Sequence, residues 1–237
     1  MTAGQDADVD IGVLSTPDEL RRLVTLFNQV WGSITPIVGV ELLRAISHGG
    51  GYVAAASHDD QIVGGSLGFL ARHDGAPALH SHVTGILPGL RQTGLGRALK
   101  RHQRAWAAEH GLAWVTWTFD PLVRRNAWFN LHVLRAVVDA YLVDFYGPID
   151  DTINHRDESD RLLVAWPTSG ELPAPAEESA DGTISVATPD DIVVLRRTDA
   201  GEATAWRHRV RAELGGALAA GGRVVGFSRD GCYLVQP

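Results

Sequence analysis

The sequence predicts an α/β protein that ends in a small extension containing both helix and strand. Apolar residues recur at helical spacing in several segments, and short apolar runs bounded by turn residues alternate with them. A stretch rich in Pro, Ala, Glu and Ser, residues 167–182, then separates the last part of the chain from the rest. With 237 residues, of which 45% are hydrophobic, the chain can bury a sizeable core.

The composition excludes several classes of function. The formal net charge is -7 and there is no long basic run, so no nucleic-acid partner is expected. Cys232 is the only cysteine and the histidines lack metal-ligand spacing, so we predict neither a disulfide nor a metal site. Residues 1–10 are polar and acidic, unlike a signal peptide, and no apolar run approaches the roughly 20 residues that cross a bilayer. A cytoplasmic protein with no membrane partner is therefore expected.

The first half of the chain alternates between the helical and the strand pattern. Thr16 can cap a helix that begins at Pro17, with acidic residues in its first turn and apolar residues at helical spacing up to Trp31. Residues 52–56 and 61–70, separated by turn residues, predict a β-hairpin. The other expected elements are strands over 11–14, 78–87 and 113–119 and helices over 39–47 and 94–110.

The second half predicts fewer regular elements and a separate extension. A helix is expected over 127–138 and strands over 141–145 and 162–166, with a loop at 154–160. Strands over 184–186 and 192–195, a helix over 203–220 and a hairpin of 223–227 with 232–235 follow. We therefore predict a domain over 1–167, a linker over 168–182 and an extension over 183–237. The extension is too small to bury much surface alone and is expected to pack on the domain.

A glycine-containing turn carries the main functional inference. The segment Arg91-Gln92-Thr93-Gly94-Leu95-Gly96-Arg97 follows an expected strand and Pro88, and it opens an expected helix. Gly94 and Gly96 let the backbone approach a ligand closely, and the first amides of the helix point outward with the positive end of its dipole. Arg91 and Arg97 can add charge-assisted hydrogen bonds to phosphate oxygens. The turn is therefore predicted to bind a pyrophosphate.

Two other phosphate-binding motifs fit this segment less well. A Walker A loop requires Gly-Lys-Ser/Thr after a four-residue gap, whereas the sequence after Gly89 gives Gly94-Leu95-Gly96. A dinucleotide fingerprint requires a third small residue at the position of Leu99 and an early place in a βαβ unit. A nucleotide-binding transferase that uses the same turn is kept as the weakest alternative.

Residues 86–99, Ile-Leu-Pro-Gly-Leu-Arg-Gln-Thr-Gly-Leu-Gly-Arg-Ala-Leu, resemble the signature of the GCN5-related N-acetyltransferases (GNAT superfamily). That signature is an apolar strand end, a proline, and Arg/Gln-x-x-Gly-x-Gly/Ala at the start of a helix. The order of elements resembles the family over about residues 11–166. The sequence is also similar to a bacterial branch of the superfamily at residues 119–122 (Phe-Asp-Pro-Leu), 126–130 (Asn-Ala-Trp-Phe-Asn) and 144–147 (Asp-Phe-Tyr-Gly).

The resemblance implies a central mixed β-sheet flanked by helices and an acyl-CoA co-substrate. The backbone of Gly85, Ile86 and Leu87 would pair with the pantetheine arm, and Asn126 and Phe129 would flank the thiol end. The pyrophosphate would bind the turn formed by Arg91, Gln92, Thr93, Gly94, Leu95, Gly96 and Arg97. Because exposed edges of such sheets often pair, a homodimer is also considered.

The implied reaction is the attack of an amine on a thioester carbonyl. It needs a deprotonated amine, a donor to the developing oxyanion and a proton for the leaving thiolate. In the family the donor is a backbone amide at a strand bulge, which falls here near Ile86 or Leu87. The strand offers no acid but carries His80 and His82 on one face and Ser81 on the other. His82 is the preferred candidate base, and two ordinary strand histidines are the alternative.

Further catalytic candidates follow the next strand. Asp120 could bind the acceptor amine or draw off its proton, and a turn-forming aspartate before Pro121 is the alternative. The tyrosine that usually acts as general acid in the family falls on Leu131, and the usual glycine after it falls on Arg135. Tyr146 is therefore the candidate acid, with His132 as a substitute. Arg124 and Arg125 either bind an acidic acceptor or lie solvated in a loop.

The sequence thus predicts an enzyme that moves an acetyl or other short acyl group from CoA to an amine of a small molecule or protein. The alternative is a non-catalytic acyl-CoA-binding module or sensor. It is favoured by the missing tyrosine and by the lack of an acid on the strand before the turn.

Overall fold

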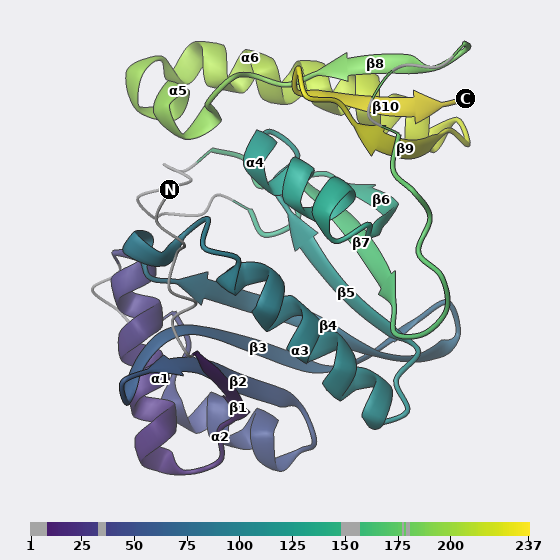
Figure 1. Ribbon diagram of the computed structural model, residues 1–237. Coiled ribbons are helices and arrows are strands. Elements are labelled where there is room, and N and C mark those ends of the chain that lie inside the picture. The colour runs from purple at the N-terminus through teal and green to yellow at the C-terminus, as the bar shows by residue number, and fades with distance from the viewer. Residues whose placement is uncertain (1–8, 33–36, 148–156, 177, 179–180) are drawn as a thin grey trace, which may run out of the picture. The chain divides into compact units, whose positions relative to one another are not determined.

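The computed structural model describes residues 9–32, 37–147, 157–176, 178 and 181–237 (Figure 1). The chain divides into two compact units, one ending at Val115 and the other beginning at Thr116. Each unit has its own strands and helices. Part of the loop predicted at 154–160 and part of the linker predicted at 168–182 lie outside the described residues.

The first unit contains four antiparallel strands in chain order. They are β1 (Asp10–Val13), β2 (Tyr52–His58), β3 (Gln61–His73) and β4 (Ala76–Ile86). Asp59 and Asp60 join β2 to β3 with φ of 47° and 61°, and Asp74 and Gly75 join β3 to β4 with φ of 47° and 72°. Two-residue turns with positive φ match the twist of paired strands. The predicted hairpin is confirmed, and β3 is longer than expected because a second turn of the same kind follows it.

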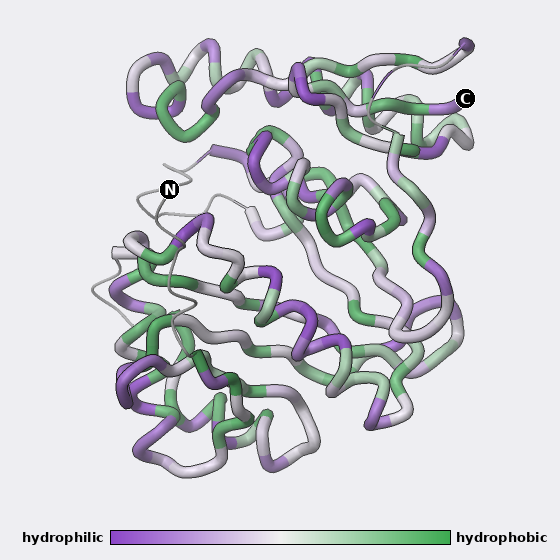
Figure 2. The backbone as a smooth tube through the Cα atoms, in the orientation of Figure 1, coloured by the Kyte–Doolittle hydropathy of each residue, from purple (hydrophilic) through white to green (hydrophobic). Residues whose placement is uncertain are grey.

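Three helices accompany this sheet: α1 (Pro17–Trp31), α2 (Val40–His48) and α3 (Leu95–Glu109). The predicted cap of α1 is confirmed, since Thr16 Oγ1 accepts from Glu19 N and the Glu19 carboxylate accepts from Thr16 N. Hydrophilic and hydrophobic residues alternate along α1, as expected for a helix that buries one side (Figure 2). Capping and amphipathicity together explain why this segment is helical.

The helices pack on both faces of the sheet at two adjacent glycines of β3. A Cβ at Gly65 would lie 2.2 Å from Leu23 of α1, and a Cβ at Gly64 would lie 3.1 Å from Leu99 of α3. Adjacent strand residues point to opposite faces, so α1 and α3 cover opposite sides. The close approach of α1 requires glycine at position 65, and this packing holds α3 and the turn before it against the sheet.

The second unit begins within β5 (Trp114–Phe119) and continues with α4 (Arg124–Ala127), a π-helical segment (Trp128–Val133), β6 (Val137–Leu142) and β7 (Arg161–Pro167). Strand β7 lies between β5 and β6 and is antiparallel to β6. The helix predicted over 127–138 is wrong at its end, because Arg135 adopts a left-handed φ of 58° and ends it. The strand predicted over 141–145 accordingly starts earlier and ends at Leu142.

The C-terminal part of this unit forms a three-stranded antiparallel sheet in the order β8-β10-β9. Its elements are β8 (Ile184–Ala187), α5 (Ile192–Thr198), α6 (Ala200–Val210), a π-helical segment (Arg211–Gly215), α7 (Gly216–Ala219), β9 (Arg223–Phe227) and β10 (Cys232–Gln236). The strand predicted over 192–195 is wrong. Asp191 accepts hydrogen bonds from the amides of Val193 and Val194, and this cap starts a helix in an apolar run too short to show helical periodicity.

Candidate functional site

The predicted pyrophosphate turn lies exposed at the start of α3. Gly94 is the N-cap residue, with φ 92° and ψ -11°, and no side chain caps this helix within the described chain. Ala98 N donates to Gly94 O at 3.0 Å, which leaves the amides of the first turn directed outward. Thr93 Oγ1 donates to Leu90 O at 2.8 Å and holds the segment before the glycine. The backbone therefore offers a group of donors at the positive end of a helix dipole.

Charge and packing support the same use of the turn. Arg91 and Arg97 are exposed on either side of Gly94. Leu95 and Leu99 are buried in an apolar cluster with Ala56 and Val63 of the sheet, so the first turn of α3 is held against the sheet. The arrangement can bind a phosphate group with fixed amides and two mobile guanidinium groups.

The end of β4 leads into this turn. Gly85 pairs with Gly65 of β3, and the amide of Leu87 donates to Val63 O at 3.0 Å. A Cβ at Gly85 would lie 2.7 Å from the ring of Trp31, so α1 also requires this glycine. The bulge expected near Ile86 or Leu87 is wrong for the pairing with β3. The register shifts instead between Leu67 and Gly68 of β3. These residues pair with Val83 and Ser81, so His82 has no partner in the register.

The two histidines of β4 share one face, as predicted. Phe69 of β3 lies beside both, with ring centroids 5.2 Å from His80 and 5.7 Å from His82. Burial, with the charges of His82 and Lys100, lowers the pKa of His80 to about 4. Partial burial also lowers the pKa of His82, the more exposed of the two. Both rings are therefore neutral near pH 7 and can accept a proton.

The opposite face of β4 carries a buried polar cluster that sequence reasoning missed. Lys100 Nζ donates to Ser81 Oγ at 2.8 Å and to Gln103 Oε1 at 3.2 Å. Gln103 Nε2 donates to Ser66 Oγ at 3.1 Å, and the hydroxyls of Ser66 and Thr84 lie 2.9 Å apart. Burial lowers the pKa of Lys100 to about 7. We call these five residues the lysine cluster.

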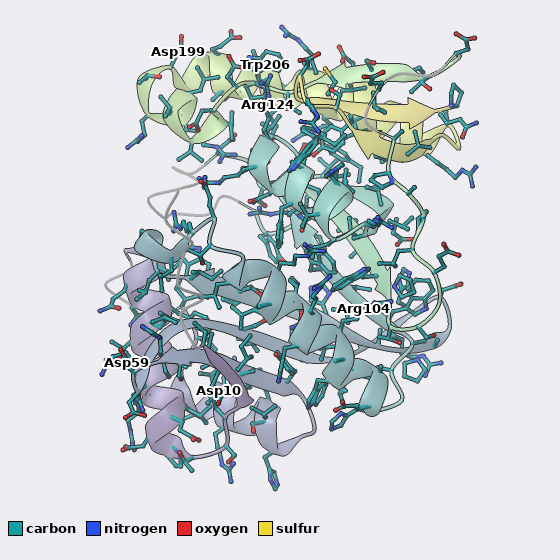
Figure 3. The ribbon with its side chains drawn as sticks, viewed as in Figure 1. Asp10, Asp59, Arg104, Arg124, Asp199 and Trp206 are labelled. Atoms are coloured by element: carbon teal, nitrogen blue, oxygen red, sulfur yellow. The ribbon has the colours of Figure 1, made fainter. Side chains whose placement is uncertain are left out.

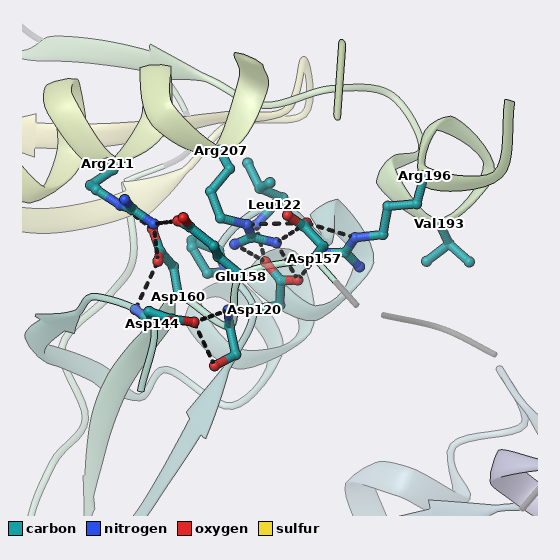
Figure 4. A network of polar contacts seen from close by, with 12 residues as sticks. Asp120, Leu122, Asp144, Asp157, Glu158, Asp160, Val193, Arg196, Arg207 and Arg211 are labelled. Carbon is teal, nitrogen blue, oxygen red and sulfur yellow. Dashed lines mark hydrogen bonds and ion pairs between the residues drawn. The ribbon is translucent and has the colours of Figure 1, made fainter. Parts of the chain in front are cut away.

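Asp120 lies at the end of β5 within a buried ionic network (Figure 4). Its carboxylate pairs with Arg196 at 2.5 Å and with Arg207 at 3.2 Å, and the same two arginines pair with Asp157 at 3.0 and 2.7 Å. Burial raises the pKa of Asp120, but Arg207 and Arg196 outweigh it and bring that pKa to about 2. We call these four residues the arginine network. Such a carboxylate remains ionised and is a weak proton acceptor.

Local contacts of Asp120 match the turn-forming alternative. Leu122 N donates to Asp120 Oδ1 at 3.0 Å, which is the hydrogen bond of an aspartate-initiated turn. Sequence reasoning missed the arginines because they lie 76 and 87 positions further along the chain. The one feature of the sequence that could have indicated this network is the aspartate, Asp120, directly after the apolar strand β5.

Tyr146 and its neighbours form a second polar group in this unit. The Tyr146 hydroxyl lies 3.2 Å from Thr118 Oγ1 of β5, and its backbone amide donates to Ser159 Oγ at 2.7 Å. The guanidinium carbon of Arg161, at the start of β7, lies 5.4 Å from the centre of the tyrosine ring. The tyrosine side chain is 43% exposed, so a ligand can reach it from solvent.

The part of the chain that contains the turn matches a model of a known protein family. Residues 20–129 match the model of the acetyltransferase (GNAT) family. This segment is a GNAT acetyltransferase domain. The family predicted from residues 86–99 is therefore confirmed. A search of the curated proteins found no match to the sequence.

Solved structures with the GNAT fold share the fold of this chain but little of its sequence. The ribosomal-protein-S18-alanine N-acetyltransferase of Escherichia coli gives a TM-score of 0.53 at 15% identity, over 69% of this chain and 96% of that one. Arabidopsis thaliana Naa50, in complex with the bisubstrate analogue CoA-Ac-MVNAL, gives 0.52 at 17% identity, over 66% and 97%. A putative GNAT acetyltransferase of Desulfovibrio desulfuricans gives 0.51 at 14% identity, over 68% and 99%. The predicted fold class, a mixed sheet flanked by helices, is confirmed.

Two positions after β5 hold residues that differ from those usual in the GNAT family, and the structure shows what these residues do. Leu131 is buried, so the position expected to hold the catalytic tyrosine contributes to the core. Arg135, which stands where the family usually has glycine, has a φ of 58°, in the left-handed region that favours glycine. Asn126 is exposed on α4 and Phe129 is half-buried in the π-helical segment, a kind of helix defect often found at functional sites. His132 stacks on Trp128 with ring centroids 4.0 Å apart.

The two arginine candidates after β5, Arg124 and Arg125, differ in their surroundings. Arg124 Nε donates to Thr188 Oγ1 at 3.1 Å, and its guanidinium pairs with Asp190 at 2.5 Å, so it contacts the C-terminal part of its own unit (Figure 3). Arg125 is exposed. Among the side chains that the structure describes, no group of three or more His, Cys, Asp or Glu residues is placed to hold a metal ion.

Proposed function

We propose that this protein transfers an acetyl group from acetyl-CoA to a primary amine of a small molecule or a protein. The observation that carries the proposal is the conformation of Gly94, which opens α3 without a side-chain cap between two exposed arginines. The pyrophosphate would bind the amides of residues 92–97 together with Arg91 and Arg97. The backbone of residues 85–87 would pair with the pantetheine arm, and Asn126 and Phe129 are the proposed contacts of the thiol end.

The proposed chemistry needs one proton acceptor and one proton donor. The amine nitrogen attacks the thioester carbonyl carbon, the carbon–sulfur bond breaks, and the proton lost by the amine is matched by one gained by the CoA thiolate. His82 is the proposed acceptor because its lowered pKa keeps it neutral at physiological pH. Tyr146 is the proposed donor. Asp120, the third candidate, is proposed to act by positioning the turn after β5, since its carboxylate is already held by two arginines.

The proposed location is the cytoplasm, and the acceptor is neither a nucleic acid nor a membrane lipid in this proposal. Of the helices in the described ranges, none combines the length and the apolar character required to cross a bilayer. The homodimer considered from the sequence stays a prediction.

The proposal is tested by comparing two glycines that share one backbone geometry. Gly94 and Gly75 both have positive φ, of 92° and 72°, and a Cβ at either would meet nothing within 4 Å. Gly94→Ala and Gly75→Ala should therefore cost similar stability, about 1–2 kcal/mol. We expect acetyl-CoA to raise the melting temperature of the wild type and of Gly75→Ala, and to bind Gly94→Ala about 10-fold more weakly.

The same proteins are then assayed for CoA release with a panel of primary amines. If millimolar acetyl-CoA leaves the melting temperature of the wild type unchanged, the proposal is wrong. Binding without turnover across the panel would instead support the alternative, a non-catalytic CoA-binding module. The burial of Leu131 at the usual tyrosine position is the observation that favours this alternative.

A further inference from the structure

Arg161 is a half-buried cation whose charge no described residue neutralises by contact. Its Nε atom is buried and makes no hydrogen bond, and no ion pair with its guanidinium occurs among the described residues. Burial lowers the pKa of Arg161 below the usual arginine range, but a guanidinium remains charged at physiological pH. A buried charge without a partner is costly, and native proteins seldom keep one without a use.

The nearby acid cannot serve as its partner. Asp120 acts electrostatically on Arg161, but that carboxylate already contacts Arg196 and Arg207. In the arginine network two carboxylates face two guanidinium groups, so its formal charges cancel. Arg161 is therefore an additional positive charge beside a balanced network.

The surroundings of Arg161 are suited to a small anion. One side of its guanidinium lies over the ring of Tyr146, which fixes its orientation. The hydroxyls of Tyr146 and Thr118 lie 3.2 Å apart, and either can be the donor in the hydrogen bond between them. Tyr146 is 43% exposed, so this group is open to solvent on one side. A planar guanidinium with two hydroxyls nearby matches the oxygens of a carboxylate.

We propose that Arg161, with the hydroxyls of Tyr146 and Thr118, binds a carboxylate of the acceptor, so that the substrate is an amine that also carries a carboxylate, such as an amino acid. This inference rests on the proposed acetyl transfer, because it assigns the acceptor of that reaction.

The test uses a product-like probe that requires no turnover. The wild-type protein, saturated with CoA, is titrated calorimetrically with N-acetylglycine and, separately, with N-acetylglycinamide, which lacks only the carboxylate charge. We expect N-acetylglycine to bind at least 10-fold more tightly, and Arg161→Met to remove that preference. Arg161→Lys should restore part of it, because it keeps the charge but not the two-pronged geometry. Equal binding of the two probes by the wild type would overturn the inference.

Arg209→Met is the matched control, because Arg209 also lies over an aromatic ring, that of Trp206, at 4.5 Å, but is itself exposed on α6. It should leave the preference for N-acetylglycine intact. The acetyl-CoA thermal shift of Arg161→Met should equal that of the wild type. A lost shift would mean that Arg161 binds a CoA phosphate, and the inference would then be wrong. If the shift is present in every variant but no amine is acetylated, the proposed function fails, while the probe titration still decides the carboxylate site.

Discussion

The two units each bury a cation, and they accommodate its charge in opposite ways. In the lysine cluster Lys100 donates hydrogen bonds to neutral oxygens of Ser81 and Gln103. In the arginine network Arg207 is fully buried but contacts Asp120 and Asp157. Burial lowers the pKa of Lys100 to about 7, whereas Asp120 and Asp157 raise the pKa of Arg207 in spite of burial.

The difference shows what a buried charge requires. A lysine whose pKa is governed by burial reduces its desolvation cost by releasing its proton. With matched carboxylates, an arginine stays charged, and the cost is offset by ion pairs and hydrogen bonds. The lysine cluster is thus sensitive to pH near neutrality, and the arginine network is sensitive to the loss of one partner. Three predictions test this comparison, from the largest expected effect to the smallest.

The largest effect is expected from breaking the arginine network. Asp120→Asn removes one negative charge and leaves Arg196 and Arg207 incompletely paired, so it should lower the free energy of unfolding by about 3–5 kcal/mol. Urea denaturation monitored by circular dichroism measures this change. Asp190→Asn is the control, because Asp190 pairs with Arg124 but is 95% exposed, and it should cost less than about 1 kcal/mol. Equal effects of the two substitutions would contradict the comparison.

The second prediction concerns the pH dependence of the lysine cluster. Lys100 has a pKa of about 7 in the folded protein, against an ordinary lysine value of 10.5, so the unfolded chain binds the proton more tightly. Stability should therefore rise with pH between these values, and by about 2 kcal/mol from pH 7 to pH 9. Unfolding free energies at both pH values measure this gain. Lys100 is the only lysine, so Lys100→Met should abolish it, and a variant with an unchanged gain would show that other groups cause it.

The smallest effect should be shared by both units, because it involves exposed polar groups. Thr16 caps α1 and Asp191 caps α5 through side-chain oxygens. Thr16→Ala and Asp191→Ala should each cost about 1 kcal/mol in thermal unfolding. Ser15→Ala is the control, since Ser15 joins the capping contacts only through its backbone amide. A cost of 3 kcal/mol or more at either cap would mean that burial of charge is not what distinguishes the large effects.

The sequence predicted most of the first unit because its elements are specified by neighbouring residues. Thr16 and Glu19 lie within one helical turn, and Asp59 and Asp60 form a complete hairpin turn by themselves. It failed where a single residue changed the local structure. Arg135 ended a helix with a positive φ that the sequence pattern does not favour, and Asp191 began a helix in an apolar run that resembled a strand.

The residues of the candidate site show the same contrast between features set by neighbouring residues and features set by distant ones. The sequence by itself determined the turn at Gly94, because a glycine with positive φ before an uncapped helix is encoded within a few residues. It also placed His80 and His82 on one face of a strand, which follows from the period of two.

Only the tertiary structure decided the partners of the charged groups. Arg196 and Arg207 reach Asp120 from 76 and 87 positions away, and Lys100 reaches Ser81 from the next element. Arg161 stands out as an unneutralised cation only once these pairs are known. The physical reason is the distance along the sequence over which each property is determined. Backbone conformation depends on adjacent residues, whereas the energy of a buried charge depends on which distant residues the fold brings into contact with it.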